Sequence, residues 1–207
     1  MLILLIGMSF MLIALPQLFN RRRWKYQWRY LRGNVPWETG QIPDPVASFI
    51  AAHPPGKAID LGCGMGTHAL ALARNGWSVT GIDFAAPAIR AARGRAAQLG
   101  LSVEFIHGDV VNASGTHGPY DLALDIGCLF SLKSAEQAAY AAGLARLLRP
   151  GAWYLLFAWL PRFIKGKPVG ISSEAIELLV RENFERRRIV MSEEQGNPAA
   201  WYWYQKR

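Results

Sequence analysis

The sequence predicts an α/β fold: a mostly parallel seven-stranded sheet flanked by helices, with one hydrophobic helix in front. Three observations predict it. Short apolar runs alternate with helical patterns, which is typical of parallel strands joined by right-handed crossovers. The last two runs are joined only by EEQGNPAA, residues 193–200, too short for a parallel crossover, so they should form a hairpin. The first 19 of the 207 residues carry no charge.

The individual elements are read from apolar runs, helical periodicity and terminal glycines. The run KAIDL at 57–61 is a short buried strand, and the helix after it should stop at Gly76, because glycine commonly ends helices. Residues 152–160, AWYLLFAWL, are apolar throughout, as expected of a strand buried on both faces. The other strands are expected at 78–83, 102–107, 120–127, 187–192 and 201–205, and the helices at 67–76, 85–99, 134–148 and 172–183.

Residues 1–19 are long enough for a membrane-spanning helix. At about 1.5 Å per residue they can cross a hydrocarbon core of roughly 30 Å. Six basic residues and no acid follow before Trp37, an arrangement that places the N-terminus outside and the rest in the cytoplasm. Trp24, Tyr26, Trp28 and Tyr30 interleave with these charges, as aromatic residues do at a headgroup boundary. We therefore expect a single-pass membrane protein that contacts lipid through residues 1–32.

Residues 1–19 have two alternative interpretations. A cleaved signal peptide fits poorly, because the charges follow the apolar run and no small-residue cleavage site is visible. The second alternative is that Met8 or Met11 is the true start and that a shorter apolar helix packs on the domain.

The distribution of charge and the spacing of the cysteines disfavour a nucleic-acid-binding protein and a metal site. Of the net charge of +8, most lies before Trp37; the remainder has 17 basic and 15 acidic residues. A nucleic-acid-binding protein would carry its basicity on the folded domain, so no nucleic-acid partner is expected. Cys63 and Cys128 lack metal-ligand spacing, and the four histidines are dispersed, so no metal site is expected. A cytoplasmic domain would keep both thiols reduced.

A glycine-rich turn followed by an acid carries the strongest functional signal. Gly62, Gly64 and Gly66 come directly after a strand and open a helix, which permits a tight turn and a close approach of ligand to backbone. Asp83 closes the second strand, 17 residues after Gly66, where an acid can accept both hydroxyls of a ribose. Asp60 precedes the turn and would suit an ammonium group but repel a pyrophosphate, which disfavours a nicotinamide oxidoreductase.

These motifs resemble those of class I S-adenosylmethionine-dependent methyltransferases. IDLGCGMGTHALALA and VTGIDF carry the likeness, and GD at 108–109, YDLALDIGCLFSL and LLRPGAWYLLF continue it in order, from Val35 to the C-terminus. The resemblance implies a Rossmann-like sheet of order 3-2-1-4-5-7-6 with strand 7 antiparallel. It also implies S-adenosylmethionine as cofactor and S-adenosylhomocysteine as product.

The same resemblance implies the residues that would hold the cofactor. The methionine part would lie against Asp60, Gly62, Cys63, Gly64 and Gly66, the ribose on Asp83, the adenine beside Phe84, Asp109 and Val110, and the sulfonium or methionine end near Asp125 and Gly127.

A second, narrower resemblance concerns the connector before the domain. YLRGNVPWETGQIPDP is similar to the N-terminal segment of small-molecule methyltransferases of the thiopurine, thiol/halide and tellurite-resistance groups. In that pattern Trp37, Glu38 and Gly40 belong to a lid over the cofactor, although glutamate replaces the commoner aspartate. Trp37 and Asp125 would help to align the reactants; alternatively, Trp37 is a packing residue. The implied domains are an anchor at 1–19, a juxtamembrane segment and lid at 20–45, and a methyltransferase domain at 46–207.

The expected function is methyl transfer from S-adenosylmethionine to a small, lipophilic acceptor at the cytoplasmic membrane face. No convincing general base is visible, and His68 reads as a packing residue, so a thiol or other soft nucleophile is favoured. Trp153, Trp159, Trp201 and Trp203 could line an acceptor pocket or belong to the core. Alternatives are the hydroxyl of a lipid or quinone precursor, a non-catalytic S-adenosylmethionine-binding protein, and a nucleic-acid or protein methyltransferase. The acceptor, the atom methylated and the oligomeric state stay open.

Overall fold

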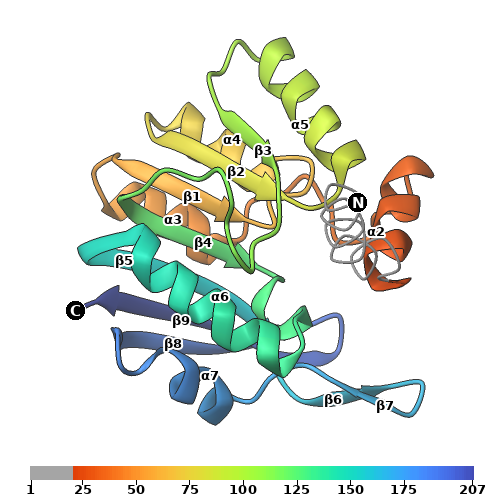
Figure 1. Ribbon diagram of the computed structural model, residues 1–207, viewed down its shortest axis with the longest axis vertical. Helices are drawn as coiled ribbons and strands as arrows, with labels where there is room; N and C mark the ends of the chain where they lie inside the picture. The colour runs from red at the N-terminus through yellow and green to blue at the C-terminus, as the bar shows by residue number, and fades with distance from the viewer. Residues whose placement is uncertain (1–20) are drawn as a thin grey trace, which may run out of the picture.

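The computed structural model describes residues 21–207 (Figure 1). The hydrophobic helix predicted at residues 1–19 lies outside the described residues, so the anchor stays a prediction. Within residues 21–207, no helix combines the length and the apolar character needed to cross a bilayer.

The centre of the molecule is a seven-stranded sheet of order β3-β2-β1-β4-β5-β9-β8. Strand β9 runs antiparallel to both of its neighbours, and the other pairs are parallel. Counted within this sheet alone, the order is the predicted 3-2-1-4-5-7-6; in chain numbering it differs, because two further strands form a separate hairpin. The strands of the sheet are β1 (Lys57–Leu61), β2 (Ser78–Asp83), β3 (Glu104–His107), β4 (Tyr120–Ile126), β5 (Leu148–Trp159), β8 (Phe184–Glu194) and β9 (Asn197–Lys206).

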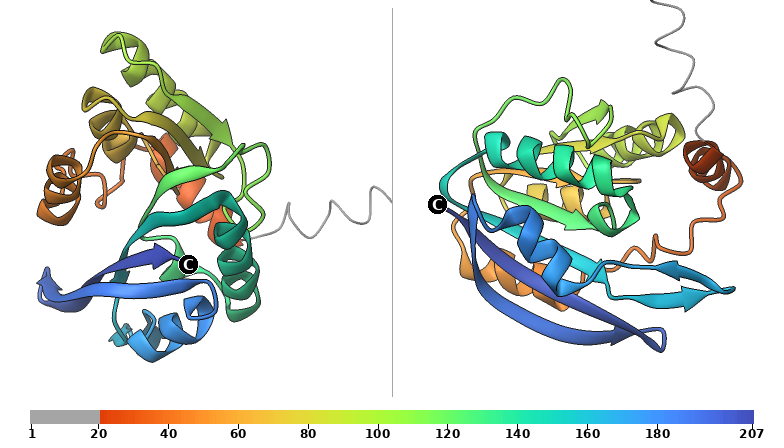
Figure 2. Two further views of the ribbon diagram at one scale, coloured as in Figure 1. Left: turned by 90° about the vertical axis from the view of Figure 1, so that its left-hand side faces the viewer. Right: turned by 60° about the horizontal axis from the view of Figure 1, so that its bottom comes forward.

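Helices cover both faces of the sheet and close two apolar cores. One core joins the sheet to α6 (Ser134–Leu147) and α7 (Ser173–Val180) and includes Tyr140 and Ile176. The other joins it to α3 (Asp44–Ala52), α4 (Thr67–Arg74) and α5 (Ala86–Gln98). Figure 2 shows these two layers from the side. Parallel strands buried on both faces explain why their sequences are continuously apolar.

Four features differ from the sequence-based expectation. Strands β8 and β9 are longer than predicted, because the charged residues of β8 continue an exposed edge strand that apolar runs do not mark. Helix α3 was not predicted, although Pro45 at its start is a favourable first-turn residue. Strands β6 (Arg162–Ile164) and β7 (Lys167–Val169) form an unexpected hairpin around Lys165 and Gly166. Helix α2 (Arg21–Leu31) precedes the lid segment.

Helix α2 presents two different faces. Arg23, Tyr26 and Tyr30 recur at helical spacing and contact the domain, as described below. Trp24 and Trp28 point outward, each with 51% of its surface exposed. Tyr26 and Tyr30 thus lie on the face of α2 that meets the domain, and the lipid contact predicted for residues 1–32 stays a prediction.

Candidate active site at the carboxyl edge of the sheet

Three buried carboxylates lie near the carboxyl ends of adjacent strands β2, β1 and β4. Asp83 ends β2, Asp60 is the penultimate residue of β1, and Asp125 is the penultimate residue of β4. Only 2% of the surface of Asp60 is exposed, and Asp125 is fully buried. Asp60 Oδ2 accepts a hydrogen bond from the Ala69 amide at 3.1 Å. Because carboxyl ends of parallel strands share one edge, these groups gather beneath a single site.

Burial raises the pKa values of all three carboxylates. Burial, with smaller contributions from the carboxylates of Asp83, Asp125 and Glu38, raises the pKa of Asp60 to about 8, against the opposing hydrogen bond from the Ala69 amide. Burial also raises the pKa of Asp83 and of Asp125, each to about 6, against the opposing effect of their hydrogen bonds. A cation that bound here would relieve this repulsion.

Asp83 accepts hydrogen bonds from two backbone amides at the glycine turn and after β2. Asp83 Oδ2 accepts from the Gly64 amide at 3.0 Å, and Oδ1 accepts from the Ala85 amide at 2.7 Å. Asp83 thereby fixes the turn to the end of β2. Each carboxylate oxygen can accept a further hydrogen bond, so this arrangement is compatible with ribose hydroxyls.

Asp125 accepts hydrogen bonds from the loop after β4 and from α6, not from the glycine turn. One oxygen accepts from the Cys128 amide at 2.7 Å, and the other accepts from the Leu129 amide at 3.0 Å and the Tyr140 hydroxyl at 2.7 Å. These bonds hold the loop that begins at Gly127, whose φ of 113° only glycine adopts readily. Asp125 therefore positions this loop in the structure, and its predicted place near the sulfonium or methionine end of the cofactor stays a prediction.

The glycine turn has no room for side chains on its inner side. Gly62, Gly64 and Gly66 all have positive φ angles, of 76°, 53° and 80°. A Cβ atom added at Gly62 would collide with the Cys128 sulfur. At Gly64 it would lie 2.9 Å from the Tyr30 hydroxyl and 3.6 Å from Glu38 Oε2. Cys63 is buried, which raises the pKa of its thiol, so its side chain packs and its backbone lines the turn.

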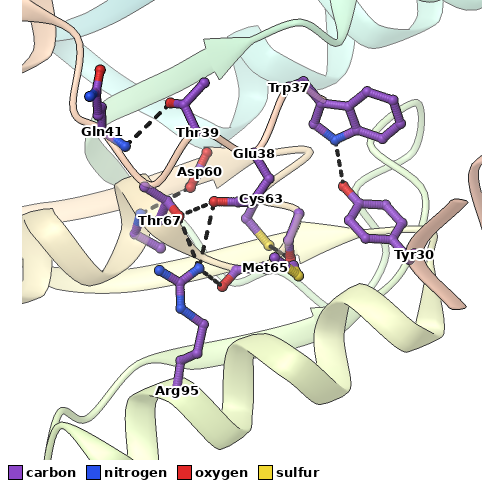
Figure 3. A network of polar contacts seen from close by, with 12 residues as sticks. Tyr30, Trp37, Glu38, Thr39, Gln41, Asp60, Cys63, Met65, Thr67 and Arg95 are labelled. Carbon is purple, nitrogen blue, oxygen red and sulfur yellow. Dashed lines mark hydrogen bonds and ion pairs between the residues drawn. The ribbon is translucent and has the colours of Figure 1, made fainter. Parts of the chain in front are cut away.

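Aromatic side chains from α2 and the lid lie above this turn. The Trp37 Nε1 donates to the Tyr30 hydroxyl at 3.1 Å, as Figure 3 shows. The Tyr26 ring lies 5.2 Å from Trp37 and meets Phe84 edge-on at 5.9 Å, centroid to centroid. Trp37 keeps 41% of its surface exposed, so it is no ordinary core residue. We call Tyr26, Tyr30 and Trp37 the aromatic roof.

Glu38 ties the roof to the turn below. Its carboxylate accepts from the Thr67 hydroxyl and pairs with Arg95, Oε1 to Nη1, at 3.6 Å. Arg95 Nη1 also donates to the Met65 carbonyl at 3.0 Å (Figure 3). Gly40, predicted to belong to the cofactor site, has a positive φ of 71° and no atom within 4 Å of where a Cβ would lie. Its positive φ lets the connector turn at this position, and its predicted place in the cofactor site stays a prediction.

The opposite end of the site carries the predicted adenine neighbours. Asp109 accepts from the Val111 amide at 3.0 Å and forms an ion pair with Arg23. The Arg23 guanidinium carbon also lies 5.5 Å from the centre of the Phe84 ring. Val110 is buried in the core beneath. Sequence reasoning missed Arg23 and Tyr26 here, although the helical spacing of 23, 26 and 30 would have indicated one shared face.

His68 lies at the start of α4 and is largely buried. Burial lowers the pKa of its imidazole to about 4, against a smaller opposing effect from Glu38. The ring is therefore neutral at physiological pH, in keeping with a packing residue. Among residues 21–207, no group of histidine, cysteine, aspartate and glutamate side chains is arranged to hold a metal ion.

A cleft of about 690 Å³ opens beside the aromatic roof. It is lined by α2, by the loop and helix start at residues 130–137, and by the segment from β7 to α7. This volume lies in the usual range for a small-molecule site. The tryptophans considered for an acceptor pocket are not among the lining residues: Trp201 and Trp203 are buried in the core, with Trp153 and Trp159 packed against it.

Comparison with known proteins agrees with this geometry. Residues 58–151 match a protein family described as a methyltransferase domain. The chain is 32% identical to a 2-heptyl-1-hydroxyquinolin-4(1H)-one methyltransferase of Mycobacteroides abscessus over 133 residues, 62% of this chain and 58% of that protein. It is 33% identical to a ubiquinone biosynthesis O-methyltransferase of Thiobacillus denitrificans over 111 residues, 53% of this chain and 46% of that one. The chain thus spans about half the length of these curated relatives.

Solved structures share the fold. A Burkholderia thailandensis 1,6-didemethyltoxoflavin-N1-methyltransferase, crystallised with 1,6-didemethyltoxoflavin and S-adenosylhomocysteine, superposes with a TM-score of 0.75 at 21% identity. The match covers 89% of this chain and 86% of that one.

Proposed function

We propose that the protein is an S-adenosylmethionine-dependent methyltransferase that transfers a methyl group to a small, lipophilic acceptor. The match of residues 58–151 to a methyltransferase domain supports this. The observation that carries the proposal is the position of Asp60 and Asp83. Both are buried beside a turn of three left-handed glycines, under the aromatic roof.

The residues present fit this cofactor. Asp60 would accept hydrogen bonds from its ammonium group, because the acidic site favours a cation and disfavours a pyrophosphate. Asp83 would hold the ribose hydroxyls while keeping the turn in place. The backbone at Gly64 lies bare below the Tyr30 hydroxyl, which would be only 2.9 Å from an added Cβ. S-adenosylmethionine, when bound, supplies an electrophilic methyl group on a sulfonium.

The chain's own residues then act by positioning and by excluding water. Trp37 and Tyr26 present aromatic faces and edges above the turn, which shield the site and attract positive charge. Asp125 keeps the loop at 127–131 in one conformation, and this loop lines the acceptor cleft through Phe130 and Ser131. Alignment of the two reactants accounts for most of what such a protein must contribute.

Two kinds of acceptor atom are compatible with the cleft. Among residues 21–207, no aspartate, glutamate or histidine lines it, so no described side chain there is an obvious general base, which favours a thiol or another soft nucleophile. The second candidate is the hydroxyl of a lipophilic ring. It is favoured by the names of the relatives, which refer to a hydroxyquinolone and to ubiquinone biosynthesis.

We also propose that the protein works at the cytoplasmic face of a membrane, with residues 1–19 as its anchor. Helix α2 follows that segment directly and exposes Trp24, Trp28 and Leu31. The β6–β7 hairpin lies on the same side of the molecule in Figures 1 and 2 and exposes 76% of Phe163, next to Ile164 and Lys165. Apolar and basic side chains in this combination favour an anionic lipid surface.

Methyl transfer by the full-length chain in lipid nanodiscs tests the proposal. The acceptors are 4-nitrobenzenethiol, 4-nitrophenol and 2-heptyl-1-hydroxyquinolin-4(1H)-one, with methyl-labelled S-adenosylmethionine as donor and the Asp83→Asn variant as negative control. Label in an acceptor with the wild type alone supports the proposal. Cofactor binding without transfer to a wide panel would favour a non-catalytic binding protein, and transfer to bulk RNA or protein would contradict a small acceptor.

A further inference from the structure

Of the residues that the structure describes, three basic side chains and no acidic one line the acceptor cleft. Lys25 and Arg29 come from one turn of α2, and Lys133 stands at the start of α6. Within residues 21–207 none of the three forms an ion pair; the Arg29 guanidinium lies 5.3 Å from the centre of the Trp37 ring. Glu136 and Glu174, the nearest acids along α6 and α7, are not among the lining residues.

Two helix N-termini add positive potential to the same cleft. Ser134 is the first residue of α6, and Ser172 caps α7 by accepting from the Ala175 amide at 3.2 Å. Both residues line the cleft. The N-terminal end of a helix carries partial positive charge and favours anions. Each first turn also carries a carboxylate: Glu136, whose Oε2 accepts from the Lys133 amide at 2.8 Å, and Glu174. These carboxylates offset part of the positive potential of the helix ends.

The remaining lining is mostly apolar, with Ser131 and Gln137 as its polar side chains, and it reaches the cofactor site. Phe130, Leu132 and Ile171 form the apolar wall. Phe130 Cε1 lies 3.8 Å from where a Gly127 Cβ would stand, and Tyr26 belongs both to the cleft and to the aromatic roof. The cleft thus combines an apolar body, a positive rim and direct continuity with the residues that would hold the methyl donor.

From this combination we propose that the cleft binds the methyl acceptor in its ionised form, as a phenolate or thiolate on an apolar body. The inference rests on the proposed methyltransferase function and narrows its substrate class to acidic acceptors. Three cations stabilise the anion relative to its conjugate acid, so the proton is released to solvent before transfer. An acceptor that is already ionised needs no general base, which accounts for a cleft without one.

The same electrostatics separates substrate from product. On transfer, the acceptor's anionic atom uses an electron pair to bond the methyl carbon, and the old carbon–sulfur bond leaves its pair on sulfur. The acceptor anion and the sulfonium cation both become neutral. The methylated product then lacks the attraction that held the substrate, so the cleft should bind it more weakly.

The test uses 4-nitrophenol and its methyl ether, 4-nitroanisole, as probes of nearly equal size. Their binding to the full-length chain in detergent micelles is measured with S-adenosylhomocysteine present, so that no transfer occurs. The yellow colour of the phenolate reports the ionisation of the bound probe. We expect the phenolate to bind about tenfold more tightly than the ether and the pKa of the bound phenol to fall by about one unit.

Matched variants test whether the basic side chains of the cleft cause the preference for the phenolate. Lys25→Met with Lys133→Met removes two rim charges and keeps the side-chain stems, and should abolish the preference. Lys165→Met, on the exposed tip of the β6–β7 hairpin outside the cleft, should leave it unchanged. Equal affinity for both probes, no binding of the phenolate, or an unchanged preference in the double variant would overturn the inference.

Calorimetry with S-adenosylhomocysteine on the same samples distinguishes a failure of this inference from a failure of the proposed methyltransferase function. Cofactor binding without a phenolate preference would remove the inference and keep the proposed function. A chain that does not bind S-adenosylhomocysteine would remove both.

Discussion

Arg23 and Asp109 lie 86 residues apart in the sequence and form an ion pair at the carboxyl edge of the sheet. This pair joins the N-terminal helix α2 to the loop that should meet the adenine. The same guanidinium lies above Phe84. The segment that connects the predicted anchor to the domain is therefore part of the candidate cofactor site.

Breaking this pair should loosen the roof over the cofactor. We expect Arg23→Gln to speed the release of S-adenosylhomocysteine about fivefold, because a partly buried ion pair of this kind contributes about 1 kcal/mol. Stopped-flow measurement of dissociation provides the rate. Arg188→Gln, which removes the same charge from the edge strand β8, serves as control. Equal release rates in both variants would mean that α2 is not a cover.

Asp83 should be the most sensitive acid for cofactor affinity. Asp83→Asn keeps the size of the side chain but removes its charge. The affinity for S-adenosylhomocysteine should fall by about 1.5–3 kcal/mol, the range for a hydrogen bond to a charged group. Asp121→Asn, at the opposite end of β4 beside Arg149, should have no effect on calorimetric affinity. Unchanged binding by Asp83→Asn would show that the glycine turn has been misinterpreted.

Asp60 should make the ligand-free protein less stable as the pH rises. Its folded-state pKa of about 8 is raised above the ordinary 3.8, so its contribution to stability is complete below about pH 4 and is lost as the pH rises through 8. Asp83 and Asp125, with pKa values of about 6, act in the same direction at lower pH. Between pH 6.5 and 8 the loss should therefore come mainly from Asp60 and amount to about 1–2 kcal/mol.

Denaturant unfolding at a series of pH values measures this loss. Asp60→Asn keeps the acceptor for the Ala69 amide and should show a nearly flat free energy of unfolding over the same interval. A wild-type curve that is equally flat would contradict the buried acidic site.

Gly62 should not tolerate even a methyl group. Gly62→Ala places a Cβ against the Cys128 sulfur at a φ of 76°, so the free energy of unfolding should fall by about 2–4 kcal/mol. Cys128→Ala in the same chain would relieve the collision but not the backbone strain, so about 1 kcal/mol of the loss should persist. Chemical unfolding of the single and double variants provides both numbers. Full recovery in the double variant would remove the backbone part of this argument.

The anchor is tested by removing residues 1–20. The shortened chain should leave the membrane fraction in sedimentation assays while still binding S-adenosylhomocysteine. If it still sediments with anionic vesicles, Phe163→Ser with Ile164→Ser in that background asks whether the β6–β7 hairpin holds it. A full-length chain that does not associate with membranes would contradict the predicted location.

The glycine turn and its acids could be predicted from sequence because they depend on local order: strand, turn, helix, strand, acid. The side-chain direction of Asp125 could not, since its partner Tyr140 follows 15 residues later on another element. The packing of Tyr26 and Tyr30 on the domain could not be predicted, because a segment at a lipid boundary and a helix packed on a protein surface share the same aromatic and basic composition. The helical spacing of these tyrosines with Arg23 indicates a shared face, but not which surface that face contacts.

Strand and helix order followed from apolar runs, because parallel strands are buried on both faces. The edge strand β8 and the β6–β7 hairpin are largely exposed, so burial does not mark their sequences. Helix α3 was missed for another reason, because it buries only Val46 and Phe49 and follows a connector rich in proline and glycine. Trp201 and Trp203 illustrate the reverse case. Their side chains are buried on one face of the sheet, and composition alone does not separate that core from a ligand pocket.

The most direct test of the central claim is calorimetric titration of S-adenosylhomocysteine and, separately, of NAD into the detergent-solubilised full-length chain. The account predicts one site for S-adenosylhomocysteine, weakened by Asp83→Asn, and no measurable binding of NAD, whose pyrophosphate the acidic turn repels. Tight binding of NAD, or no binding of S-adenosylhomocysteine, would contradict it.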